Sequence, residues 1–144
     1  MGKAEALKED VGTAHLKGLR RKISMENRVY RTVMKGLIEP LILWSLLKKA
    51  MHGYEIVRKI SELVGHRFTH GKVYPLLYRL EDQGLIRGKW ERVGKRRRRK
   101  IYRITEKGLK TLRGLKELFG DRLKAFIRDI TRETRNLYGK TVRK

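Results

Sequence analysis

Residues 70–105 constrain the fold of this chain most strongly, because a helical pattern there is followed by two strand-like segments joined by a basic run. Gly84 is placed to end the helix in a left-handed conformation. Beyond it, apolar and charged residues alternate on both sides of residues 94–100, the period of a half-buried hairpin. We predict a compact core that carries a hairpin with a flexible basic tip. The helix is apolar on one face at Val73, Leu76, Leu77 and Leu80.

The tip of that hairpin is a run of adjacent cations: Lys95, Arg96, Arg97, Arg98, Arg99 and Lys100. Such charges repel one another and cost stability unless an anion neutralises them. The chain has 38 Lys and Arg against 15 Asp and Glu, a formal net charge of +23, which is typical of nucleic-acid binding. Charge alone also fits RNA, a phospholipid surface or an acidic protein, so its arrangement must decide.

Length and composition bound the remaining classes. The 144 residues suit one modest domain with an extension, and the lack of Cys excludes disulfides and thiolate catalysis. His66 and His70 are four residues apart, but residues 67–69 look extended and no acidic ligand is near. We expect no metal, no cofactor and no enzymatic activity. No apolar run suits a membrane span or a secretory signal, so we expect a cytoplasmic, nucleoid-associated protein without a membrane partner.

The order of elements predicts a mostly α fold with a small β-hairpin. Residues 1–24 read as a basic N-terminal arm or a weak helix, and Met25 is either an alternative start or an internal methionine. Over 25–105 we predict a helix that ends at Gly36, a second one from Glu39 with Pro40 at its first position, and a third over 52–64 closed by Gly65. With the helix at 70 and the hairpin, this is the winged helix-turn-helix order of a DNA-binding domain.

Residues 106–144 predict one long dimerisation helix that Thr105 caps. A helix that extends past a small domain cannot bury its apolar stripe on that domain alone, so an antiparallel helix of a second subunit is the expected partner. Packing on the helix from Glu39 is the alternative. The stripe consists of Leu112, Leu115, Phe119, Leu123, Phe126, Ile130 and Leu137.

Several segments between residues 37 and 112 closely resemble the PadR family of transcriptional regulators. The resemblance implies a winged-helix domain, a homodimer joined through the C-terminal helix, and repression of transcription by operator binding. It also implies that small ligands release the protein from DNA in some members. The matching segments are 52–56 (HGYEI), 71–81 (GKVYPLLYRLE), 84–86 (GLI), 102–105 (YRIT) and Gly108.

The chain also departs from that family's pattern. Lys72-Val73 stands where Thr-Leu is usual, and the unbroken basic run replaces a Gly-Arg-Pro-Arg wing. Both changes add positive charge and strengthen contacts with a phosphate backbone, whose affinity falls steeply with salt. The C-terminal helix has no Trp, so an aromatic ligand sandwich is not supported and the small-molecule effector stays unknown.

The helix from His70 is expected to enter the major groove with its N-terminal residues nearest the base edges. Tyr74 and Tyr78 are equally well explained as core aromatics, and Arg79 as an ion-pair partner of Glu55 or Glu81. The basic run is assigned to phosphates or an adjacent minor groove. Trp44 and Trp90 are predicted to be core or interface residues. The candidate contacts on the helix are Thr69, His70, Lys72, Tyr74, Tyr78 and Arg79.

These observations favour a sequence-specific regulator of transcription, a dimeric repressor that binds double-stranded DNA at a pseudo-palindromic operator. The half-sites are expected one helical turn apart, about 34 Å, or a multiple of it. One alternative is a sequence-tolerant architectural protein that binds DNA or RNA through the same basic surface. Another is an adaptor whose basic hairpin binds an acidic protein.

Overall fold

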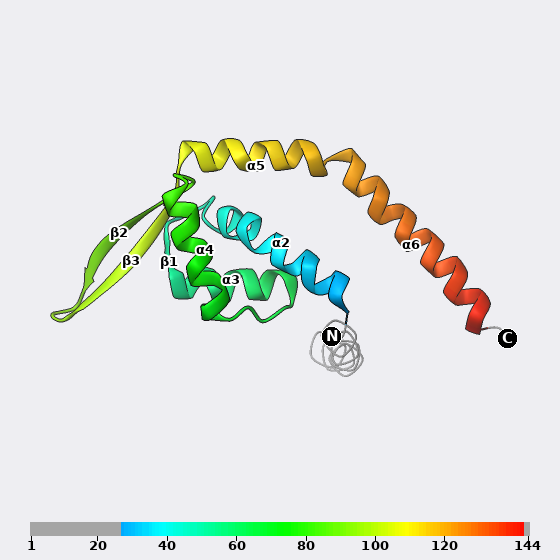
Figure 1. The fold of residues 1–144 in the computed structure, drawn as a ribbon, viewed down its shortest axis with the longest axis horizontal. Coiled ribbons are helices and arrows are strands. Elements are labelled where there is room, and N and C mark those ends of the chain that lie inside the picture. The colour runs from blue at the N-terminus through cyan, green and yellow to red at the C-terminus, as the bar shows by residue number, and fades with distance from the viewer. Residues whose placement is uncertain (1–26, 143–144) are drawn as a thin grey trace, which may run out of the picture. The chain divides into compact units, whose positions relative to one another are not determined.

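The computed structural model describes residues 27–142, and the arm predicted over 1–24 lies outside them, as does Met25. The chain forms two compact units, Met1–Pro40 and Leu41–Lys144. The elements follow in the order α2 Arg28–Ser45, β1 Met51–His52, α3 Gly53–Val64, α4 His70–Asp82, β2 Ile86–Val93, β3 Arg97–Ile104, α5 Glu106–Phe119 and α6 Asp121–Val142 (Figure 1).

Helix α2 is continuous where two helices were predicted, so the expected break before Glu39 is wrong. It begins after Asn27, whose Oδ1 accepts from the backbone N–H of Val29 at 2.9 Å. Pro40 lies inside the helix and lacks the N–H that would bond the carbonyl four residues back. Buried side chains fix the last turns in the second unit, so packing outweighs local propensity. They are Ile42, Leu43 and Leu46.

The core of the second unit lies between the end of α2, helices α3 and α4, and the base of the sheet. The helical spacing that predicted an apolar face on α4 is confirmed for three of its four residues, while Leu76 is only half-buried. Ser45 is fully buried, and its hydroxyl donates to the Ile42 carbonyl at 2.7 Å. The buried apolar side chains of α3, α4 and the sheet are Met51, Ile56, Val57, Ile60, Val73, Leu77, Leu80, Ile86 and Tyr102.

Helix α3 is capped at both ends, and the connector from α3 to α4 packs into the core. His52 caps α3, because its Nδ1 accepts from the backbone N–H of Glu55 at 3.3 Å. Gly65 ends the helix with φ +62°, a left-handed conformation that costs glycine little. The connector 66–69 is not a strand, and it buries Phe68, whose N–H donates to the Ser61 hydroxyl at 3.1 Å. Helix α4 therefore starts at a fixed position beside α3.

The sheet has three antiparallel strands in the order β1-β3-β2. The hairpin β2–β3 was predicted from its alternation, whereas β1 has only two residues and gave no sequence signal. Its pairing of Met51 with Tyr102 joins the start of α3 to the hairpin. The turn is limited to residues 94–96, with Gly94 at φ +73°. Arg97 to Lys100 therefore belong to a paired strand, and the expectation of a long flexible tip is wrong.

The C-terminal segment begins as expected but forms two helices. The Thr105 hydroxyl accepts from the N–H of Gly108 at 3.1 Å and caps α5. At Gly120 the backbone leaves the helical range, with ψ −114°, and α6 starts at Asp121. Asp121 supplies a negative charge that suits the first turn of a helix. Figure 1 shows the change of direction between α5 and α6. The continuous helix predicted from residue 106 is thus interrupted.

Candidate nucleic-acid interface

Helix α4 divides cleanly into a buried side and an exposed side. Val73, Leu77 and Leu80 face the core with almost no exposed surface. Lys72 and Arg79 are exposed, and Tyr78 exposes 53% of its surface. Thr69 precedes the helix in an extended conformation, and both Thr69 and His70 are exposed. The structure thus brings five of the six α4 candidates to the surface.

Tyr74, the sixth candidate, is half-buried and packs across the start of α3. A Cβ built on Gly53 would lie 2.8 Å from the Tyr74 hydroxyl oxygen, so only glycine lets α3 and α4 approach this closely here. The ring of His70 also stacks on Tyr54, with centroids 5.2 Å apart. Tyr54, which is not among the contacts predicted from the sequence, is 59% exposed. Sequence reasoning therefore missed a tyrosine that lies beside the start of α4.

The hairpin β2–β3 with its turn, residues 86–104, is called the wing below. It contains ten Lys and Arg residues and one acid, Glu91. The register pairs Trp90 with Lys100 and Gly88 with Tyr102, so these four lie on one face, together with the buried Ile86. Arg97 and Arg99 lie on the other face with Ile101. The pleat therefore distributes the basic run over two faces.

Trp90 was predicted to be a core or an interface residue, and the structure rules out the core role. It shares its face with the buried Ile86, as the alternation indicated, but it is 61% exposed. The wing extends past the core, so a residue on the inward face is buried only near the base of the hairpin. Trp44 is also partly exposed, and the ammonium of Lys59 lies 5.1 Å from the centre of its ring.

Lys100 lies apart from the other cations of the run. Its ammonium nitrogen is 2.8 Å from Glu81 Oε2 on α4, and its side chain is only 18% exposed. The rings of Tyr78, Trp90 and Tyr102 surround it, with centroids 5.3, 6.0 and 5.4 Å away. Lys95, Arg96, Arg97 and Arg98, by contrast, are exposed. The basic surface near the turn is formed by those four.

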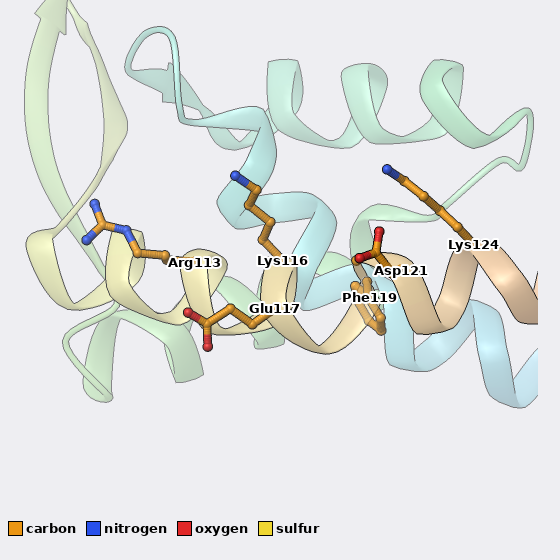
Figure 2. A pocket seen from close by; sticks show the side chains of 7 residues that line it. Arg113, Lys116, Glu117, Phe119, Asp121 and Lys124 are labelled. Atoms are coloured by element: carbon orange, nitrogen blue, oxygen red, sulfur yellow. The ribbon is translucent and has the colours of Figure 1, made fainter.

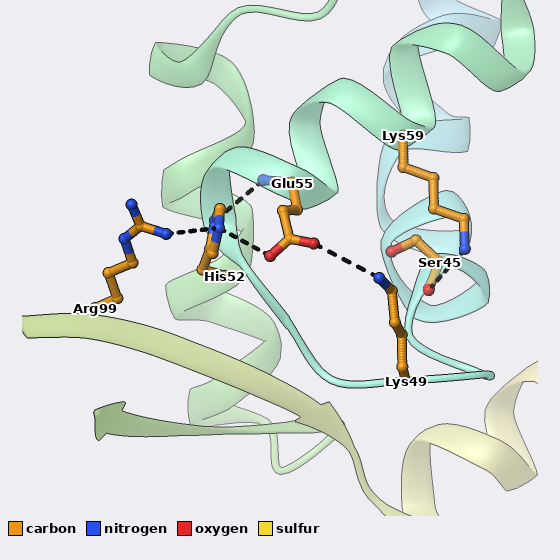
Figure 3. A network of polar contacts seen from close by, with 6 residues as sticks. All are labelled: Ser45, Lys49, His52, Glu55, Lys59 and Arg99. Carbon is orange, nitrogen blue, oxygen red and sulfur yellow. Dashed lines mark hydrogen bonds and ion pairs between the residues drawn. The ribbon is translucent and has the colours of Figure 1, made fainter. Parts of the chain in front are cut away.

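Arg99 lies against the start of α3, as Figure 3 shows. One of its guanidinium nitrogens is 3.3 Å from His52 Nε2. His52 Nε2 is also 2.8 Å from Glu55 Oε1, and the other carboxylate oxygen of Glu55 is 3.9 Å from the Lys49 ammonium nitrogen. His52 Nδ1 accepts from the backbone N–H of Glu55, so the ring lies between the Arg99 guanidinium and the Glu55 carboxylate. This network joins the middle of β3 to α3.

Tyr102 is buried where the wing meets α4. Burial raises the pKa of its hydroxyl to about 12, and the neighbouring Tyr78, Glu81 and Tyr74 act in the same direction. The phenol therefore stays neutral at physiological pH. The base of the wing thus contributes no negative charge from Tyr102.

The C-terminal helices expose most of the predicted apolar stripe. Phe119, Phe126, Ile130 and Leu137 are exposed, whereas Leu112, Leu115 and Leu123 are half-buried. At the junction of α5 and α6 an open cavity of about 770 Å³ lies beside Phe119. Figure 2 shows Lys116 and Lys124 projecting to one side of it. Its lining mixes these cations and Arg113 with Glu117 and Asp121.

No group of three or more His, Asp or Glu in residues 27–142 could hold a metal ion. No helix within the same part of the chain is long and apolar enough to cross a membrane.

Comparison with known proteins identifies the family. Residues 42–114 match the transcriptional regulator PadR-like family. The chain belongs to this family. The match covers the end of α2, both central helices, the sheet and the start of α5, which are the elements that form the surface described above. The predicted resemblance and the winged-helix fold are confirmed, and PadR-like proteins are transcriptional regulators and not enzymes.

Solved structures and a sequence relative agree with this assignment. A transcriptional regulator from Thermoplasma acidophilum is 28% identical with a TM-score of 0.62, over 69% of this chain and 95% of that one. PadR of Bacillus subtilis, solved in complex with operator DNA, is 28% identical with a TM-score of 0.52, over 55% of this chain and 45% of that one. A Lysinibacillus sphaericus protein named Uncharacterized protein X is 32% identical over 78 residues, 53% of this chain and 72% of that one.

Proposed function

We propose that this PadR-family regulator binds double-stranded DNA as a homodimer and represses transcription from a pseudo-palindromic operator. The observation that carries the proposal is the exposed polar side of α4 beside a wing with ten cations and one acid. In helix-turn-helix proteins the second helix of the motif enters the major groove with its exposed polar side, and α4 is that helix here. The similarity to Bacillus subtilis PadR, solved with operator DNA, supports the same partner for this chain. Such a regulator acts in the cytoplasm, on the nucleoid.

Base reading is assigned to the exposed side of α4 and backbone binding to the wing. Lys72 lies in the first turn of α4, where side chains reach base edges most easily. Thr69 and His70 lie beside it, and Tyr78 and Arg79 follow one to two turns later. The exposed cations at 95–98 bind phosphates on the adjacent backbone or in a narrow minor groove. Tyr74, half-buried against Gly53, contributes mainly to the position of α4.

The proposed dimer forms through the C-terminal helices. Three of the four stripe residues on α6, Phe126, Ile130 and Leu137, are exposed in the single chain, and a second copy would cover them. We expect sedimentation equilibrium at micromolar concentration to give about twice the 17.0 kDa mass of one chain. A mass of 17.0 kDa under those conditions would contradict the dimer.

A competition experiment separates the nucleic-acid class from the other classes. A labelled DNA duplex bound to the protein is challenged with unlabelled duplex, structured RNA or polyglutamate at near-physiological salt. The proposal predicts that duplex DNA displaces the label at the lowest concentration. Equal displacement by RNA would favour the sequence-tolerant alternative, which the charge of the wing supports. Displacement by polyglutamate alone would favour an acidic protein partner.

Substitution of Lys72 tests whether α4 reads bases. We expect Lys72→Ala to lower affinity for the preferred duplex by about 1–3 kcal/mol and to relax the preference at one position in each half-site, because a lost base contact affects only the sequence it read. Binding of a library of single-position operator variants measures this. Equal losses on every variant would show that Lys72 contacts phosphate instead.

A further inference from the structure

The charge of Lys100 faces the protein, whereas the cations at 95–98 are exposed to solvent. It sits on β3, and its ammonium nitrogen crosses to α4 to reach Glu81 Oε2 at 2.8 Å. That carboxylate oxygen is shielded from solvent. A shielded carboxylate needs a compensating charge, and Lys100 supplies it.

Three aromatic rings complete the surroundings of the ammonium group. Tyr78 comes from α4, Trp90 from β2 and Tyr102 from β3, and each ring centre is 5.3–6.0 Å from the Lys100 nitrogen. Ring faces attract a cation at such distances. The contact thus joins the helix proposed to read DNA to both strands of the wing.

Gly88 makes room for this arrangement. A Cβ at Gly88 would lie 2.3 Å from Lys100 Cε, 3.0 Å from Glu81 Oε2 and 3.1 Å from a ring carbon of Tyr102. The absence of a side chain at residue 88 therefore lets the lysine stem pass across β2 to the helix. We call the set Glu81, Gly88 and Lys100 with the three rings the Lys100 clamp.

We infer that Lys100 is a positioning residue, whose ammonium group holds the wing against α4 so that both elements meet the DNA in one geometry. This inference rests on the proposed function. It removes Lys100 from the phosphate contacts predicted for the basic run. Operator discrimination then depends on the clamp, because bases are read only when α4 and the wing are placed together.

The test measures affinity for a duplex selected by the wild-type protein and for a scrambled duplex, with Lys100→Met, Glu81→Gln, their double variant and Gly88→Ala. Lys110→Met is the matched control, since Lys110 has an exposed pairing with Glu106 on α5. Thermal unfolding by circular dichroism confirms that each variant is folded at the binding temperature. Gly88→Ala changes no charge, so it displaces the lysine stem without altering long-range electrostatics.

The expected result is about a tenfold loss of discrimination between the two duplexes for each single variant of the clamp. The double variant should also lose about tenfold and not a hundredfold, because both changes break one pair. On the scrambled duplex the salt slope of Lys100→Met should equal that of wild type. Lys110→Met should retain wild-type discrimination.

The direction in which Glu81→Gln changes DNA affinity distinguishes a positioning role of Lys100 from a phosphate contact. If Lys100 contacted phosphate, removal of the acid would tighten binding, and Lys100→Met would reduce the salt slope by about 0.9. Either result, or wild-type discrimination in all clamp variants, would overturn the positioning role. If the wild-type protein itself did not discriminate between the duplexes, the proposed function would fail instead.

Discussion

A protein in which Lys95, Arg96, Arg97 and Arg98 are replaced by glutamine binds every duplex more weakly, and its affinity depends much less on salt. Each phosphate contact contributes about 0.9 to the slope of log affinity against log salt, so loss of four contacts lowers the slope by about 3.6. Between 50 and 200 mM salt, the wild-type affinity therefore falls roughly a hundredfold more than that of the variant. Fluorescence anisotropy across a salt series measures both slopes.

The control for this prediction is a second quadruple variant, which loses the same amount of positive charge from another part of the chain. If long-range charge alone governs binding, both quadruple variants will lose the same part of the slope. If the wing contacts the backbone, the control will retain most of it, because salt screens charges beyond about 10 Å. The control replaces four exposed cations of α5 and α6 by glutamine: Lys110, Arg122, Arg128 and Arg135.

A Gly108→Ala protein is expected to be less stable by about 2 kcal/mol, with a melting temperature lower by roughly 4–8 °C. The new Cβ would lie 2.3 Å from the Leu85 carbonyl oxygen and 2.7 Å from Ile104 Cγ1, so backbone must move. That carbonyl accepts from the N–H of Thr105 at 3.1 Å, and Thr105 caps α5. The substitution therefore strains the junction at which α4, the wing and α5 meet. Differential scanning calorimetry measures the change.

Gly114→Ala is the matched control on the same helix. No atom lies within 4 Å of a Cβ built on Gly114, and the residue is exposed on α5. Alanine stabilises a helix interior by about 1 kcal/mol relative to glycine, so this variant should melt at a higher temperature than wild type. Opposite shifts at the two glycines would confirm the close approach at Gly108. Stabilisation at both would show that α5 does not pack there as described.

Local patterns predicted most elements of the winged-helix fold because each carries its own signal. Alternation predicted the wing, helical spacing predicted α4, and Gly65 and Thr105 marked helix ends. The two-residue β1 could not be predicted, since only its pairing with β3 defines it. Residues 28–45 were predicted as two helices because Gly36 and Pro40 locally favour a break in the helix. The burial of Ile42 and Leu46, which opposes that break, depends on the folded unit.

The sequence identified which residues belong to the candidate site but not how they are placed relative to the core and to α4. The pattern of the wing showed which residues share a face, but not how far the core extends along it, so the exposure of Trp90 could not be predicted. The partners of Lys100 within the wing were within reach of sequence reasoning. A turn limited to 94–96 sets residue 90 opposite residue 100, and the glycine at 88 leaves the space beside it. The contact with Glu81 required the position of α4, which no local pattern supplies.

Sequence-specific binding by a dimer is tested most directly by selection of bound duplexes from a random library at near-physiological salt, in the presence of a competing nonspecific duplex. We expect enrichment of an inverted repeat, with half-site centres about 34 Å apart or a multiple of that distance, because two copies of α4 would read it together. Tight binding without enrichment of any sequence would contradict it, since the basic surface would then bind the backbone alone.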